Sequence, residues 1–117
     1  MLNVETLDKL CTEIGEETLA ELLTFFIDEA RARLDRIAAH IETGDLSALD
    51  GEAHALKGSA RTYGLSQLGD LAETVERAGE AGDKDEVLSV SRTLIGVASD
   101  HLDALKLFTK SLESQVS

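Results

Sequence analysis

The stretch that decides the fold is residues 16–42, which read EETLAELLTFFIDEARARLDRIAAHIE. Apolar side chains recur along it at intervals of three and four residues, a spacing that places them on one face of an α-helix. We therefore predict one long amphipathic helix over this range. Its apolar stripe comprises Leu19, Leu22, Leu23, Phe26, Ile27, Ala30, Leu34, Ile37 and Ile41.

The same periodicity occurs on both sides of this segment, and glycine separates the periodic stretches. Gly15 and Gly44 bound the long helix, and glycine is the residue that most readily ends a helix. Ser66 and Asp83 are the predicted N-caps of the last two helices. The further helices are predicted at residues 4–14, 46–62, 66–79 and 83–112. The first presents Val4, Leu7, Leu10 and Ile14, and the third presents Leu46, Leu49, Ala53, Leu56, Ala60 and Tyr63.

Composition supports an all-helical chain. The 117 residues contain no proline, which would interrupt a helix, and few strand-forming residues alternate with polar ones. Short connections make consecutive helices antiparallel neighbours. The predicted fold is all-α: an antiparallel up-down four-helix bundle with a short N-terminal cap helix, forming a single domain over residues 1–117.

Net charge limits the possible partners. With 23 acidic and 11 basic residues the chain carries a charge of −12, which repels nucleic acid and anionic membranes at long range. It has no apolar stretch of the roughly 20 residues that span a bilayer and no signal peptide, so a cytoplasmic protein is expected. Cys11 is the only cysteine, and His40 and His101, which lie near helix ends or flanks, are not expected to converge with His54 on a metal.

The helix predicted at 46–62 carries an exposed histidine among small residues. His54 lies about 135° from the centre of the apolar stripe on the helical wheel. Its neighbours on that side are small, and two of them are glycines, each costing about 1 kcal/mol of helix stability relative to alanine. Such a surface would leave the imidazole open to a docking protein. These neighbours are Ser47, Gly51, Ala55, Gly58 and Thr62, and together with Arg61 they are the residues expected to contact a partner protein.

The charged residues that closely follow His54 in the sequence are basic, although the chain as a whole is acidic. Between residues 53 and 69 the charged side chains other than His54 are Lys57 and Arg61, both basic. Lys57 follows His54 by three residues and can reach the space beside the ring. A histidine flanked by cations suits an anionic adduct, because the cations offset charge on a transferring phosphoryl group. Two solvated bases on a surface would be the alternative interpretation.

The run HALKGSARTYG at residues 54–64 resembles the signature of histidine-containing phosphotransfer (HPt) domains. That pattern has leucine two residues after the histidine, lysine three after, glycine four after, small residues five and six after, and glycine ten after. Ala53 before the histidine and the preceding Gly44-Asp45 also match. The resemblance covers nearly the whole chain, including the five-helix layout.

The resemblance implies a function and a set of partners. In the family the histidine is phosphorylated on a ring nitrogen, usually Nε2, by an aspartate of a response-regulator receiver domain or by a histidine kinase. His54 would be the phospho-acceptor, Lys57 would steady the phosphoryl oxygens, and Gly58 would give clearance for the receiver. Such domains have no kinase or phosphatase activity and bind no cofactor, because the receiver supplies Mg²⁺. A monomer that passes the group between a hybrid histidine kinase and receivers is expected.

Two points stay open at the level of sequence. A non-catalytic adaptor bundle that binds a receiver or a partner helix without phosphoryl transfer is the alternative function, although it would not need His54. Some HPt domains carry a glutamine on the following helix that hydrogen-bonds near the histidine, whereas this chain has Glu76 at the expected spacing. A carboxylate there could orient the imidazole but would repel a phosphoryl group. Neither Glu76 nor Gln67 is assigned to the site.

Overall fold

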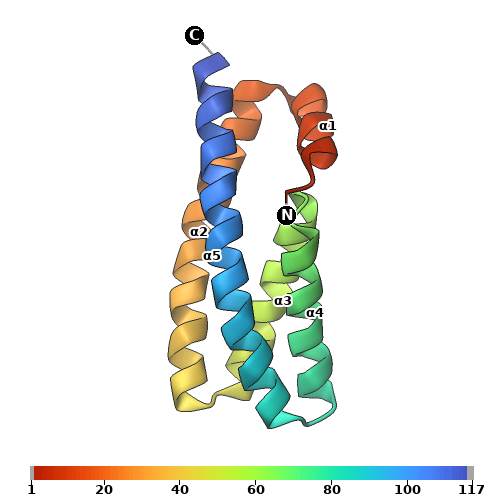
Figure 1. Ribbon diagram of the computed structural model, residues 1–117, viewed down its shortest axis with the longest axis vertical. Coiled ribbons are helices and arrows are strands. Elements are labelled where there is room, and N and C mark those ends of the chain that lie inside the picture. Colours follow the sequence, from red (N-terminus) through yellow and green to blue (C-terminus); the bar gives the residue numbers. More distant parts are fainter. Residues whose placement is uncertain (1, 116–117) are drawn as a thin grey trace.

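The computed structural model describes residues 2–115, and these residues form helices joined by short turns (Figure 1). The predicted segments are all helical, with ends within a few residues of those expected; the last helix extends three residues beyond the predicted end. The helices are α1 (Val4–Ile14), α2 (Glu16–Thr43), α3 (Leu46–Thr62), α4 (Ser66–Glu80) and α5 (Lys84–Gln115).

The last four helices form the antiparallel bundle. Each packs against the next along the chain, and α2 packs against α5, which closes the ring of four. The first and last helices of the bundle, α2 and α5, are 28 and 32 residues long, whereas α3 and α4 have 17 and 15 residues. The long pair therefore extends beyond the short pair, and α1 lies over the ends of α3 and α4 (Figure 1). The predicted bundle with an N-terminal cap helix is confirmed.

The core consists of one apolar stripe from each helix, and the opposite faces are polar. Most of the predicted stripe of α2 is buried, but Leu22 is 41% exposed because it lies at the edge of the stripe, beside the fully buried Leu23. In α1 only Leu7 is buried, while Val4 and Ile14 are exposed. Because α1 is short and packs mainly against α2, only a narrow strip of its surface is buried. No helix within residues 2–115 has an apolar stretch long enough to cross a membrane.

The turn between α3 and α4 ties the start of the chain to the bundle. Gly64 adopts φ +78°, and its carbonyl accepts a hydrogen bond from the Asn3 backbone N–H at 3.1 Å. A Cβ on Gly64 would lie only 3.0 Å from the Asn3 carbonyl oxygen, so glycine is required there. Asp83 caps α5 as predicted, through the Glu86 N–H. The prediction for Ser66 was wrong, because Ser66 is already the first helical residue and Leu65 precedes it.

His101 lies within α5, on the flank of the helix that faces the core rather than near an end, and is 3% exposed. Its Nδ1 has no hydrogen-bond partner among the described residues. Burial lowers the pKa of His101, because a charged imidazole would lose its hydration. The folded protein therefore holds this ring neutral at a pH at which the unfolded chain already binds a proton.

This difference predicts a stability loss in mild acid. The unfolded state binds a proton on His101 below its ordinary pKa of 6.5 and the folded state does not, so the free energy of unfolding falls as the pH falls below about 6.5. We expect His101→Leu to remove this contribution. Urea unfolding between pH 7.5 and 5 would measure it, and the wild-type protein should lose more stability than the variant. Parallel curves would contradict the prediction.

Candidate functional site

His54 lies on the exposed face of α3 with its ring open to solvent. The buried stripe of α3 comprises Leu49, Ala53, Leu56 and Ala60, and it fixes the rotation of the helix in the bundle. This rotation leaves the His54 side chain 72% exposed, as predicted. The ring lies on the side of α3 that borders α4, because its hydrogen-bond partner comes from that helix.

Glu76 of α4 joins His54 and Lys57 into one cluster. Its Oε2 lies 3.1 Å from Nδ1 of His54, and its Oε1 lies 2.8 Å from the Lys57 ammonium. The Glu76 side chain is only 14% exposed and that of Lys57 23%, so both are much more buried than the His54 ring. Sequence spacing had indicated Glu76 as a candidate but could not assign it. The structure places it in direct contact with the histidine.

The charge on Glu76 determines which ring nitrogen is free. The Lys57 ammonium, together with His54, holds the pKa of Glu76 below its usual range, although burial would raise it. An ionised carboxylate only accepts hydrogen bonds, so Nδ1 of His54 must carry the proton that it donates. The tautomer follows from this hydrogen-bond assignment. In a neutral ring, Nε2 then holds the free lone pair, on the side of the exposed ring away from Glu76.

The predicted small-residue surface is present around the ring. Ser47, Gly51, Ala55, Gly58 and Thr62 are all exposed. A Cβ built on Gly51 or Gly58 would meet no atom within 4 Å outside the helix itself. The bundle therefore does not require glycine at either position, and no packing contact compensates for the helix stability that each glycine loses relative to alanine. The space beside the exposed imidazole is therefore open to a docking protein.

Comparison with known proteins places this arrangement in a family. The sequence model of the Hpt domain matches residues 21–108. The chain belongs to the Hpt domain family. The matched range contains α3 with His54 and most of the bundle.

Three similar proteins extend the comparison. The phosphorelay protein LuxU of Vibrio cholerae is 27% identical over 86 residues, which are 74% of this chain and 76% of LuxU. LuxU of Vibrio harveyi is 24% identical over 109 residues, which are 93% of this chain and 96% of that LuxU. The crystal structure of histidine-containing phosphotransfer protein B from Pseudomonas aeruginosa PAO1 superimposes with a TM-score of 0.79 at 24% identity, covering 97% of this chain and 95% of that one. This likeness supports the bundle fold of the Hpt domain.

Arg61 of the Hpt domain is directed away from His54. Its guanidinium lies 3.3 Å from Asp70 and 3.4 Å from Glu73, both on α4. Its side chain crosses Gly69, where a Cβ would lie 2.8 Å from the Arg61 Cγ. Arg61 is 43% exposed in its side chain and could contact a docked protein, but its charge is already paired. Its predicted role in partner binding stays a prediction.

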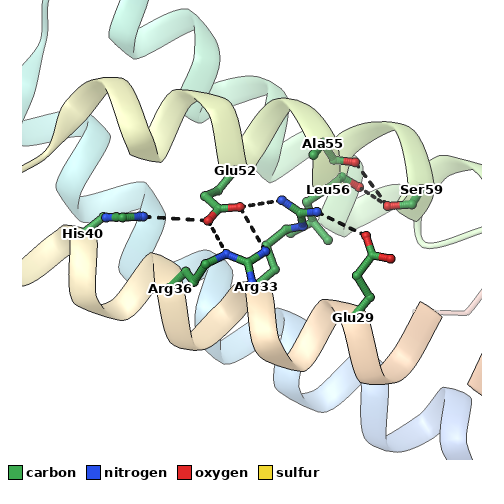
Figure 2. A network of polar contacts seen from close by, with 8 residues as sticks. All are labelled: Glu29, Arg33, Arg36, His40, Glu52, Ala55, Leu56 and Ser59. Atoms are coloured by element: carbon green, nitrogen blue, oxygen red, sulfur yellow. Dashed lines mark hydrogen bonds and ion pairs between the residues drawn. The ribbon is translucent and has the colours of Figure 1, made fainter. Parts of the chain in front are cut away.

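The side of α3 opposite Glu76 is held to α2 by a second ion-pair network (Figure 2). The carboxylate of Glu52, 12% exposed, contacts the guanidinium groups of Arg33 and Arg36. Burial would raise the pKa of Glu52, but the two arginines outweigh burial and hold the pKa below its usual range. Arg33 also reaches Glu29, while Nε2 of His40 lies 3.8 Å from Glu52. Because Glu52 precedes His54 by two residues, this network fixes the segment that carries the histidine.

Removing the central carboxylate should destabilise the bundle. In Glu52→Ala the Arg33 side chain, 16% exposed, would lose its main partner, and we expect the free energy of unfolding to fall by about 1–3 kcal/mol. Chemical denaturation measures it. Glu29→Ala is the matched control, because Glu29 is 50% exposed and its pair with Arg33 should contribute less than about 1 kcal/mol. Equal losses in the two variants would contradict the central role of Glu52.

Two further polar side chains close to His54 or Glu76 in the sequence make no contact with the site. Gln67 is exposed in the first turn of α4, more than two turns before Glu76. Ser59 donates its hydroxyl hydrogen bond to backbone carbonyls of its own helix. Within residues 2–115 there is no group of three or more histidine, cysteine or acidic side chains that could hold a metal ion.

Proposed function

We propose that this Hpt domain is a phosphoryl carrier of a two-component phosphorelay and that it accepts the group on Nε2 of His54. The observation that carries the proposal is the hydrogen bond from Nδ1 of His54 to the ionised Glu76, on a ring that is 72% exposed. It supports a fixed tautomer with the nucleophilic nitrogen facing a partner. The family and the two phosphorelay relatives support the same function.

The proposed transfer divides the chemistry between two proteins. The lone pair of Nε2 attacks the phosphorus of an aspartyl phosphate, and the bond from phosphorus to the aspartate oxygen breaks, leaving a carboxylate on the receiver. The receiver would supply Mg²⁺ and the acidic pocket, so this chain needs no cofactor and no kinase or phosphatase activity of its own. Receivers and a hybrid histidine kinase are the proposed partners of a monomeric carrier.

Lys57 has a proposed role at the phosphoryl group and an observed contact at Glu76. Its ammonium is three residues from His54 on the same helix face, within reach of a group on the ring. To steady phosphoryl oxygens it would exchange part of its contact with Glu76 for them. The surface of Ser47, Gly51, Ala55, Gly58 and Thr62 is the proposed docking face for the receiver.

A phosphoryl-transfer assay tests the proposal. The protein would be mixed with a phosphorylated receiver domain and Mg²⁺, and an acid-labile, base-stable label on this chain is the expected result. A chain that binds the receivers but takes no label from any of a broad panel would support the alternative, an adaptor bundle without phosphoryl chemistry.

A further inference from the structure

Glu76 is placed to act on the phosphorylated ring as well as on the free one. Of its two carboxylate oxygens, Oε2 accepts from Nδ1 of His54 and Oε1 faces the Lys57 ammonium. The carboxylate lies on the side of the ring opposite Nε2, so a phosphoryl group on Nε2 would not displace it. The hydrogen bond can therefore persist through the whole transfer cycle.

Phosphorylation changes the charge of the ring that Glu76 contacts. A ring with a phosphoryl group on Nε2 and a proton on Nδ1 carries a positive charge, whereas the same ring without that proton is neutral. A carboxylate 3.1 Å from Nδ1 favours the charged form. Among the described side chains, Glu76 is the acid that contacts the ring, and its low exposure reduces screening by solvent.

We infer that Glu76 is a positioning residue that keeps Nδ1 protonated while the phosphoryl group is on Nε2, so that His54 gives the group up readily. The inference rests on the proposed function. When the group leaves, the bond from phosphorus to Nε2 breaks and its electron pair stays on Nε2. With Nδ1 protonated the product is neutral imidazole; without that proton it would be imidazolate, a much poorer leaving group. Glu76 thus favours rapid onward transfer over storage.

The other charged groups near the ring are already engaged or lie a turn away. Lys57 contacts Glu76, and its charge keeps that carboxylate ionised. Arg61 and Arg77 both pair with Glu73, one turn before Glu76 on α4. Asp50 precedes His54 by one turn on α3, and Glu80 follows Glu76 by one turn on α4. These more distant acids should change the protonation of the ring less than Glu76 does.

The direct test measures the pH at which the phosphorylated ring of His54 loses its Nδ1 proton. Wild-type protein, Glu76→Gln and Glu73→Gln would be phosphorylated with phosphoramidate, a small donor that needs no receiver, and titrated by ³¹P NMR with His54→Gln to assign the signal. Glutamine keeps a hydrogen-bond acceptor of the same size but has no charge. We expect the ring of Glu76→Gln to lose its proton about one pH unit lower than wild type. The phosphorylated variant should also lose its label several-fold more slowly near pH 8, both alone and to a receiver.

Each outcome decides the inference. Glu73→Gln is the matched control: it removes an acid of the same helix that contacts Arg61 and Arg77 but not His54, and it should titrate like wild type. Equal titration of wild type and Glu76→Gln, an equal shift in Glu73→Gln, or no adduct on His54 would overturn the inference. If phosphoramidate labels His54 and receivers do not, the proposed function fails while the role of Glu76 is still tested.

Discussion

His54→Gln should abolish phosphoryl acceptance and leave the fold intact. Glutamine has no ring nitrogen with a free lone pair, so no bond to phosphorus can form at this position. The His54 side chain is 72% exposed and makes one hydrogen bond, to Glu76, which the glutamine amide can partly replace. Label transferred from a phosphorylated receiver should fall to the background of the assay, while circular dichroism and the unfolding midpoint change little.

The other two histidines provide the controls for this result. His40 is half-buried and lies near Glu52, and His101 is buried in α5, so neither presents a ring comparable to that of His54. His40→Gln should accept the phosphoryl group at the wild-type rate. If His54→Gln accepted the group fully, or if His40→Gln lost the activity instead, the assignment of the nucleophile would be wrong.

The fold followed from the sequence because its determinants are local. The apolar stripe of residues 16–42 and the glycines that separate the helices report directly on helix position and buried face. Apart from the cap of α4, the sequence was least informative where burial depends on a neighbouring helix. Leu22 has the right spacing but lies at the edge of the stripe, and His101 has a polar side chain on a core face. Periodicity alone cannot show how wide a face its partner covers.

The site followed from the sequence only in part, for the same reason. His54 and Lys57 lie on one helix, so their spacing fixes their relation. Glu76 is on α4, and its contact with them depends on the register between α3 and α4, which Gly64 and the packing of Gly69 against Arg61 help to set. A shift of one residue along α4 would turn the carboxylate away. The sequence therefore indicated Glu76 as a candidate, and only the packed bundle identifies its two contacts.

Gly58→Leu should slow transfer from a receiver strongly without weakening the fold. Gly58 lies one turn after His54, and a Cβ built there would meet no atom within 4 Å outside the helix itself. A leucine would fill space that a receiver must occupy to bring its aspartyl phosphate to Nε2. A displacement of about 1 Å can cost 10²-fold in rate, so a loss of about that size is expected in rapid-mixing transfer experiments. Stability should rise by up to about 1 kcal/mol, because leucine forms helix better than glycine.

Two comparisons separate docking from chemistry in this variant. Gly96 on α5 is also an exposed helical glycine with free space around it, so Gly96→Leu should gain similar stability and transfer at the wild-type rate. Phosphoramidate is small enough to reach Nε2 past a leucine, so Gly58→Leu should react with it nearly as fast as wild type does. A variant that is slow with both donors would mean that residue 58 acts on the histidine itself. A variant that is slow with neither would show that the open space beside His54 is not used for docking.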